Sequence, residues 1–547
     1  MEKYKFLIPV LKTMRKKISR RLLGIVILTI IISVTELIIP YMTKLIFDKG
    51  IQEKNISIFI KLLCVTAFLY VLKSIINFFC NKLYISTSNY VVKTVESDIV
   101  DRLIRMPLSF FDKYENGYIL SRMNEVENIR NLFSPMILRI IISFFSFFGA
   151  IGILISIDYR ILILVGFLTP VLYCVSKKNT TQLRDMVAQL RESIALKLSN
   201  LQNTISAVCD IKGLCIESGK VKEYQHYIQK TIDQSVNQNI KTSVANESVT
   251  LFSGIADILT LFLAGFLIIS GRLGIGDYIA IVGYMGKIFS PVQQVASLSI
   301  TIQPALSSLT RLSFFYSNNI EDDFFGEKEI DKIDRLEFKN VTFSYPEGDK
   351  VILNNLSFIA EKSDNIVIMG KNGSGKTSIA NLIMLFYSNY SGQILFNNNE
   401  LKTYNVRSLR QKIGIVSQKI LLFPGTIEDN ITIGVSNITE DILNFVIDIC
   451  DLRETVIWAN KYNFLVAENG KNLSGGQIQK IAIARAIIRK PDILILDEIN
   501  NNLDEKAQKM VLNLVENYFL NIITIIITHD KKMQKLATKV ISLHDEE

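Results

Sequence analysis

The sequence predicts two parts of different fold class, an α-helical membrane domain followed by a soluble α/β domain. Apolar residues make up 49% of the 547 residues, and the long apolar runs all lie before about residue 305. A glycine-rich phosphate loop follows a short apolar stretch near residue 370. A chain of this length also exceeds a single domain of ordinary size. We therefore expect a membrane domain over residues 1–317, a linker over 318–331 and a soluble domain over 332–547.

Six apolar stretches are candidates for membrane spans, since a spanning helix needs about 20 mostly apolar residues. They cover residues 22–42, 58–79, 132–157, 161–175, 249–269 and 278–298. The segments after the second and fourth stretches are long and charged, whereas the others are short. Eight of the first 21 residues are Lys or Arg and one is Glu. Such a basic flank predicts a cytoplasmic N-terminus, so the two long segments are expected to be cytoplasmic as well.

The composition also excludes some classes of function. The net charge of +9 is concentrated in the N-terminal flank, and the soluble part has no comparable basic cluster. We therefore expect no nucleic-acid partner. The six cysteines form no Cys-x-x-Cys pair, which predicts neither disulfides nor a zinc site.

Lys61 and Lys73 interrupt the second apolar stretch, and Glu36, Asp257 and Lys287 interrupt the first, fifth and sixth. A charge in the middle of a bilayer is costly, so each of the last three should face a partner or a wet cavity. The sequence leaves two interpretations open, a substrate or ion pathway and a structural pair between helices.

The phosphate loop has the sequence GKNGSGKTS and fits the pattern G-x-x-x-x-G-K-[ST] between an expected strand and an expected helix. Its glycines let the backbone close around phosphates, Lys376 can reach the β- and γ-phosphates, and Thr377 can offer its hydroxyl to Mg²⁺. The residues expected to bind nucleotide are Gly370, Lys371, Asn372, Gly373, Ser374, Gly375, Lys376, Thr377 and Ser378.

Two later strands are expected to end in reactive side chains. The stretch DILILDE predicts a central parallel strand buried on both faces. At its end, Asp497 can hold Mg²⁺ through water and Glu498 can polarise the attacking water as general base. The stretch IITIIITHD ends at His529, where an imidazole can contact the γ-phosphate, because doubly wound sheets bind ligands at strand ends. His226 and His544 have no such setting.

A second anion-binding feature, NLSGGQIQKIAIARA, runs from Asn472 to Ala486. Its Ser-Gly-Gly turn opens a helix, where backbone N–H groups and the helix dipole favour an anion. The domain already has a phosphate loop for its own nucleotide. The anion at this turn is therefore expected to belong to a different nucleotide.

These motifs, in this order, resemble the nucleotide-binding domain of ATP-binding cassette (ABC) transporters. The six spans with long cytoplasmic loops resemble the exporter-type membrane domain of the same superfamily, so the resemblance covers nearly the whole chain. It implies six transmembrane helices and an α/β P-loop ATPase domain with a RecA-like core, a helical subdomain and an antiparallel β subdomain. It also implies ATP and Mg²⁺ as cofactors.

The resemblance assigns further roles. Tyr345 matches the aromatic residue that stacks on adenine, and Gln418 matches the glutamine that senses Mg²⁺ and the membrane domain. The signature spans Leu473 to Gln477, and its expected nucleotide-binding residues are Ser474, Gly475, Gly476 and Gln477. Glu468 fits the loop that contacts the coupling helices, and residues 106–123 resemble the pattern ahead of the first coupling helix.

The sequence departs from the family pattern at three places. The D-loop reads Asn501-Asn502-Leu503-Asp504 where Ser-Ala-Leu-Asp is usual. Ile499-Asn500 replaces Ala-Thr after Glu498, and Ala467 stands where a glycine is expected. These departures bear on communication between sites, since every residue with a direct chemical role is present.

In this family two nucleotide domains face each other head to tail, so Ser474 is expected to hold the phosphate of a partner chain's ATP. One set of spans, one phosphate loop and one signature per chain therefore predict a dimer. A homodimer is the simplest solution, and the unusual D-loop leaves a heterodimer open. The expected partners are this second chain, membrane lipid and the transported substrate.

The predicted function is ATP-driven export of a peptide, lipid or amphipathic small molecule by alternating access. Two alternatives stay open, an exporter-shaped importer of a metal chelate and an ATP-gated channel or regulator. The intact Glu498 weighs against the channel. Abundant Ile, Asn and Lys suggest a bacterial plasma membrane as the location, with the nucleotide-binding domain in the cytoplasm.

Overall fold

The computed structural model describes residues 7–114, 116–130, 135–321, 325–346, 348, 350–371, 373–461, 464–499, 505–530 and 533–543. The chain divides into two compact units. One comprises Met1–Asp101 and Ile119–Ser317, and the other comprises Arg102–Tyr118 and Asn318–Glu547.

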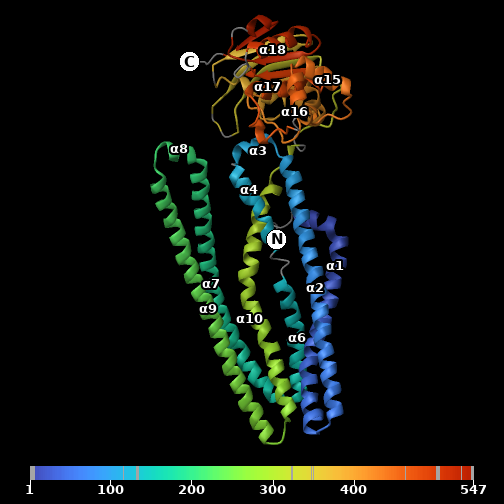
Figure 1. The fold of residues 1–547 in the computed structure, drawn as a ribbon, viewed down its shortest axis with the longest axis vertical. Coiled ribbons are helices and arrows are strands. Elements are labelled where there is room, and N and C mark those ends of the chain that lie inside the picture. Colours follow the sequence, from blue (N-terminus) through green and yellow to red (C-terminus); the bar gives the residue numbers. More distant parts are fainter. Residues whose placement is uncertain are drawn as a thin grey trace. The chain divides into compact units, whose positions relative to one another are not determined.

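The first unit is helical. Its helices are α1 (Leu7–Leu45), η2 (Ile46–Gln52), α2 (Ile56–Ile104), α4 (Asn116–Asn124), α5 (Val126–Ile129), α6 (Pro135–Ile157), α7 (Tyr159–Ser206), α8 (Val208–Gly213), α9 (Glu217–Ile269), α10 (Ile275–Leu312) and α11 (Phe314–Ser317), with the ends of α2 and α4 reaching into the second unit. The helices α7 and α9 run side by side and are joined through the short α8 (Figure 1).

Four helical stretches among the described residues are long and apolar enough to cross a membrane: Ile18–Gln52, Ile56–Ile104, Ile140–Ile157 and Glu217–Ile269. A fifth, Tyr159–Val175, is apolar but shorter. Each expected span falls on one of the long helices, apart from residues 132–134, which lie outside the described residues. The sixth span falls on α10, which is not among the four, so the count of six stays a prediction.

Short polar segments end these helices where the sequence predicted turns. Asp158 caps α7, because its carboxylate accepts a hydrogen bond from the Arg160 backbone N–H at 2.8 Å. At the start of α10 the carboxylate of Asp277 accepts from the Gly274 N–H at 3.0 Å and lies 2.5 Å from the Lys44 ammonium of α1. These contacts fix the ends of α1, α7 and α10 without long loops.

The helices pack through a shared apolar core. Tyr284 of α10 is fully buried, and its hydroxyl donates to the Leu37 carbonyl of α1 at 2.8 Å. Gly283 allows this approach, since a Cβ at that position would lie 3.0 Å from Pro40. On α9, Phe262 and Ile269 are 75% and 89% exposed, as expected of side chains that face lipid.

The second unit contains two sheets. The antiparallel sheet has the order β2-β1-β4-β5, from β1 (Arg335–Phe343), β2 (Leu353–Glu361), β4 (Tyr390–Phe396) and β5 (Asn399–Glu400). The parallel sheet has the order β6-β7-β8-β3-β9, from β3 (Asn365–Gly370), β6 (Ile413–Val416), β7 (Ile493–Asp497), β8 (Ile523–Ile527) and β9 (Lys539–Leu543). Every residue of β7 and β8 is buried, as their continuous apolar runs predict.

The second unit also contains seven named α-helices and three short turns among its described residues after the first sheet strand. They are α12 (Lys376–Ile383), α13 (Val406–Gln411), α14 (Ile427–Thr432), α15 (Glu440–Ile449), α16 (Arg453–Lys461), α17 (Gly475–Ile487) and α18 (Glu505–Asn517), with the short turns η5 (Leu401–Thr403), η6 (Glu468–Gly470) and η8 (Met533–Leu536). The expected linker is not entirely outside this domain. Ile330 is 5% exposed, and its backbone N–H bonds the Ser408 hydroxyl at 2.8 Å.

The segment Arg102–Tyr118, which lies in the first long loop of the sequence, belongs to the second unit. It includes the helix α3 (Leu108–Lys113), and Leu108 packs against the core beneath the antiparallel sheet. The hydroxyl of Tyr387 donates to the carboxylate of Asp112. Burial and this carboxylate raise the pKa of Tyr387 far above its usual range, so the hydroxyl remains a donor.

Replacing Tyr387 by Phe should loosen this segment. Phe keeps the ring but removes the hydrogen bond to a carboxylate, and local opening of Arg102–Tyr118 should rise roughly 10- to 100-fold. Amide hydrogen exchange of residues 102–114 measures this. The matched control is Tyr404→Phe, which removes a hydroxyl that donates to the Phe396 carbonyl at 3.2 Å and should leave exchange at Arg102–Tyr118 unchanged. Equal exchange in both variants would show that the Asp112 contact contributes nothing.

Candidate functional site

The candidate site lies at the carboxyl edge of the parallel sheet. Register aligns Ile368 of β3, Ile527 of β8 and Asp497 of β7 in one row, since Ile368 pairs with Ile527 and Asp497 pairs with Ile527. The next residues along the three strands are therefore neighbours at one edge. This edge holds the phosphate loop, the two carboxylates after β7 and the histidine after β8.

The phosphate loop is shaped by its glycines. A Cβ on Gly370 would lie 2.4 Å from the Ser374 hydroxyl and 2.8 Å from the Leu543 carbonyl, so only glycine fits. Gly375 has a φ of +90° and is crowded by Ile352. Lys376, which begins α12, is 5% exposed, and its ammonium donates to the carbonyls of Gly370 and Lys371, each at 2.8 Å.

The described residues fit a nucleotide with a bound Mg²⁺. The Oγ of Ser374 and Oδ1 of Asp497 are buried and have no hydrogen-bond partner among the described residues. Burial raises the pKa of the Asp497 carboxyl, while a hydrogen bond from Thr377 opposes that rise. Mg²⁺ commonly takes one or two protein oxygens and completes its shell with phosphates and water. Asp497 and Thr377 offer such a pair next to the loop.

Glu498 has an unusual backbone conformation. Its φ is +49°, which few non-glycine residues adopt, and its N–H donates to the Ile527 carbonyl at 2.9 Å. This turn directs the side chain toward Gln418, whose amide donates to Glu498 Oε2 at 2.5 Å. The sequence predicted both residues for the site but gave no sign of this contact. Strain of this kind gathers at functional sites.

The other predicted residues are distributed as follows. His529 comes two residues after the end of β8, and its side chain is exposed at the same sheet edge. The exposed Glu468 begins the turn η6. Asn372, Asn500, the D-loop residues Asn501 to Asp504 and His544 lie outside the described residues, and the other histidine, His226, is exposed on α9.

Tyr345 packs into an aromatic cluster beside the phosphate-loop helix. Its ring meets Phe343 and Tyr387 edge-on, with centroids 5.0 and 5.1 Å apart. Its hydroxyl lies 2.9 Å from the Ser378 hydroxyl of α12. Because Tyr387 also bonds Asp112, the predicted adenine-stacking residue is two contacts away from α3. Sequence reasoning missed Tyr387, since nothing in its local pattern distinguishes it from a core aromatic residue.

The signature turn forms the start of α17. The Ser474 hydroxyl accepts from the Gln477 N–H at 3.3 Å, and the Gln477 side chain accepts from the Ser474 N–H at 2.9 Å. This capping box presents the helix N-terminus as the sequence predicted. Ser474 and Gly475 are exposed, and a Cβ on Gly476 would meet no atom within 4 Å. The turn is therefore open to a ligand from outside the chain.

Charges in the apolar helices divide into two cases. Glu36 of α1 forms ion pairs with Lys73 of α2 at 2.8 Å and with Lys287 of α10 at 2.9 Å. Asp257 of α9 is exposed and forms no ion pair among the described residues. Of the two settings expected for Asp257, a cationic partner is therefore not found within the described part of the chain, where the buried face of α9 carries Ala256 and Thr260. A wet cavity beside Asp257 stays a prediction.

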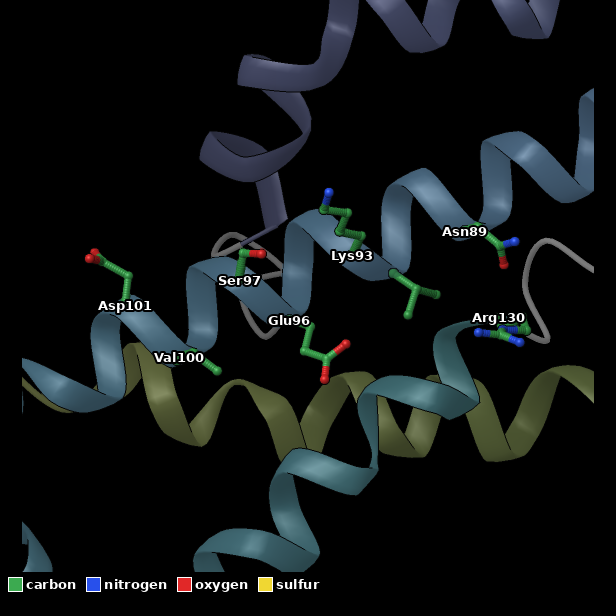
Figure 2. A pocket seen from close by; sticks show the side chains of 8 residues that line it. Asn89, Lys93, Glu96, Ser97, Val100, Asp101 and Arg130 are labelled. Atoms are coloured by element: carbon green, nitrogen blue, oxygen red, sulfur yellow. The ribbon is translucent and has the colours of Figure 1, made fainter. Parts of the chain in front are cut away.

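A separate open hollow lies along α2 in the first unit (Figure 2). Its volume is about 700 Å³, and the side chains of α2 that face it include Lys93 and Glu96. Asp101 and Arg130 add one charge of each sign. The charges balance, so the hollow offers a ligand no net charge.

Two family models match the chain. The model of the ABC transporter transmembrane region matches residues 22–292, and the ABC transporter model matches residues 353–501. The chain belongs to the ABC transporters. It is therefore a multi-pass membrane protein whose soluble part binds and hydrolyses ATP. The predicted fold class, a helical membrane domain with an α/β ATPase domain, is confirmed, while the number of spans stays a prediction.

Known proteins resemble this ABC transporter over most of its length. It is 27% identical to the alpha-hemolysin translocation ATP-binding protein HlyB of Escherichia coli O157:H7, over 96% of this chain and 74% of that protein. It is 25% identical to the ATP-dependent lipid A-core flippase of Pseudoalteromonas translucida, over 89% of this chain and 84% of that protein. The solved structure of a bacterial Atm1-family ABC exporter with ATP bound superimposes on this chain with a TM-score of 0.81 and 21% sequence identity. The match includes 97% of this chain and 94% of the exporter chain. The transporter thus has the exporter fold.

Proposed function

We propose that this ABC transporter exports a peptide, lipid or amphipathic small molecule, driven by ATP hydrolysis and working as a dimer through alternating access. The observation that carries the proposal is the meeting of the phosphate loop, Asp497 and the Gln418–Glu498 pair at one sheet edge. Such an edge can position a phosphoryl group, a metal ion and a water together.

The residues of this edge would divide the chemistry among them. The loop N–H groups from Gly370 to Ser378, with the Lys376 ammonium, would hold phosphate oxygens, and Tyr345 would contact adenine. Thr377, Asp497 and Gln418 would hold Mg²⁺, which supplies charge neutralisation when bound. Glu498 would orient the attacking water and accept its proton at a carboxylate oxygen. His529 would contact the γ-phosphate.

The signature supports the proposal of a dimer. The helix α17 begins at Ser474 to Gln477, of which Ser474 and Gly475 are exposed, and the chain supplies its own phosphate loop elsewhere. A second chain would bring its nucleotide to this turn. A homodimer is the simplest assembly, and a heterodimer is the alternative because of the Asn-rich D-loop.

We also propose domain limits of 1–317, 318–331 and 332–547, with residues 106–123, which include α3, leading into the first coupling helix. The location would be a bacterial plasma membrane, with that domain in the cytoplasm. The basic flank supports this orientation, because it ends in Arg20 and Arg21 directly before the first expected span.

Proteoliposomes test the proposal. ATP added outside reaches only transporters whose nucleotide-binding domains face outward, so an exporter accumulates its substrate in the lumen. The probes are a fluorescent peptide, a fluorescent phospholipid and a cationic dye, each with ATP and Mg²⁺ or with ATP and EDTA. Accumulation of at least one probe that requires Mg²⁺ supports export. Loss of preloaded probe from the lumen would indicate an importer, and probe movement on ATP binding without turnover would indicate a channel.

A further inference from the structure

The cluster of Glu36, Lys73 and Lys287 borders a cavity in the first unit. The cavity has a volume of about 520 Å³ and is enclosed by α1, α2, α6 and α10. This volume falls within the range of small-molecule sites, roughly 300–1,000 Å³. Its lining is rich in hydrogen-bonding groups, which include Asn77, Ser143 and Gln294. Side chains of α2, α6 and α10 therefore bring polar groups to the cavity that Glu36 borders.

The charges of the cluster do not balance. Glu36 is 17% exposed at its side chain and contacts both ammonium groups, one through each carboxylate oxygen. Lys287 lines the cavity, whereas Lys73 is not among the lining residues. Glu36 also lines the cavity, and Lys73 approaches its second oxygen from outside the lining. The cluster of one carboxylate and two ammonium groups at this wall therefore carries one net positive charge. A net charge in an apolar helix bundle is costly, and ionisable groups retained there mark sites that bind or conduct a ligand.

The ammonium of Lys287 also has hydrogen-bonding capacity that no described residue takes up. An ammonium carries three donors, and one of those on Lys287 goes to Glu36 Oε2 at 2.9 Å. The carboxylate is less available to a ligand, since both of its oxygens are engaged and Oε2 lies 3.5 Å from the Ser146 hydroxyl. The wall thus offers donors and positive charge, which suit a group with several acceptor oxygens and negative charge.

We propose that this cavity binds the anionic group, a phosphate or a carboxylate, of the molecule that the transporter moves, with Lys287 as its main contact. The proposal rests on the proposed export function and specifies its substrate class. Glu36 sets the strength of the site by neutralising one of the two lysines, and the amide and hydroxyl groups around it hold the remaining oxygens.

The test removes the positive charge of Lys287 in one variant and the negative charge of Glu36 in another. The full-length protein is placed in phosphatidylcholine nanodiscs, and ATP hydrolysis is measured against octyl phosphate, with octyltrimethylammonium as the cation of equal tail length. Octyl phosphate should stimulate hydrolysis and the cation should not. Lys287→Gln should raise the concentration for half-maximal stimulation about 10- to 100-fold, and Lys287→Arg should keep it within about threefold. Glu36→Gln should lower it, because Lys73 is then released.

A purely structural ion-pair cluster predicts a different result, since Lys287→Gln and Glu36→Gln would then both weaken the response. That outcome, an equal response to the cation, or no response to an anion would overturn the proposal. Two further variants keep the test valid if Glu36→Gln fails to fold. A Cβ on Gly286, which lines the cavity, would meet no atom within 4 Å, so Gly286→Leu should fill the cavity and abolish stimulation. Gly166→Leu is the control, since Gly166 has equal space, is exposed on α7 and does not line the cavity.

A second arm separates lipid headgroups from free anions. Nanodiscs that contain dioleoylphosphatidic acid as a minor component replace octyl phosphate. Stimulation by phosphatidic acid alone identifies a lipid headgroup as the ligand, and stimulation by octyl phosphate alone identifies a free amphiphile. Either result supports the anion site if the stimulation is lost in Lys287→Gln. The proposed function is judged separately. Basal hydrolysis that disappears in Glu498→Gln supports an ATP-driven transporter even when no anion acts, whereas absent basal hydrolysis in the wild type counts against the transporter itself.

Discussion

Glu498→Gln is expected to lower steady-state ATP hydrolysis by about 10²–10⁴-fold, the usual loss when a general base is removed. Glutamine keeps the size of the side chain and can still lie against Gln418, but it cannot accept the proton of the attacking water. The phosphate loop and Asp497 are unchanged, so ATP binding should persist. The variant should therefore accumulate a closed dimer loaded with ATP, which nucleotide occupancy and cross-linking between chains can measure.

The matched control for this change is Glu516→Gln on α18, which removes one exposed carboxylate from the same domain without touching the sheet edge. Its turnover should remain within about twofold of the wild type, as surface substitutions are usually mild. Near-normal turnover in Glu498→Gln would remove Glu498 from the role of base. The strained φ of +49° would then need another explanation.

The second large effect concerns dimers mixed from two variants, one chain with Lys376→Ala and the other with Ser474→Ala. If each ATP lies between one chain's phosphate loop and the other chain's signature, one site of the mixed dimer meets both lesions and the other site meets none. The mixed dimer should retain one intact site and show partial hydrolysis. Either variant as a homodimer has two damaged sites and should be nearly inactive. Nucleotide trapping per site and total turnover measure the two effects.

Ser474 also caps α17, and loss of a cap costs about 0.5–2 kcal/mol. Thr426→Ala is the matched control, because Thr426 and Asp429 form the same kind of capping box at the start of α14. This control should lower stability similarly and leave the mixed-dimer pattern unchanged. Trapping at neither site of the mixed dimer would refute the shared arrangement, and with it the case for an obligate dimer.

The nucleotide site was accessible from sequence because its residues follow a general rule. The continuous apolar runs of β3, β7 and β8 identify buried parallel strands, and the carboxyl ends of parallel strands lie at one edge. The side chains directly after those runs, Asp497, Glu498 and His529, could therefore be placed together without knowing the fold. The start of α17 could also be predicted from the sequence, since a Ser-x-x-Gln capping box involves only four consecutive residues.

What the sequence alone determined is the set of elements and the residues at their ends, because periodicity, caps and glycine loops act within a few residues. Only the tertiary structure decided which faces meet. Gln418 and Glu498 are 80 residues apart, Asp112 and Tyr387 are 275 apart, and Glu36 and Lys287 are 251 apart. An apolar helix such as α1 or α10 has no pronounced polar face in its sequence, so its rotation is set by close packing such as that of Gly283 on Pro40. That packing brings one carboxylate between two lysines, so three charges that are far apart in the sequence form one cluster with a net positive charge beside a cavity.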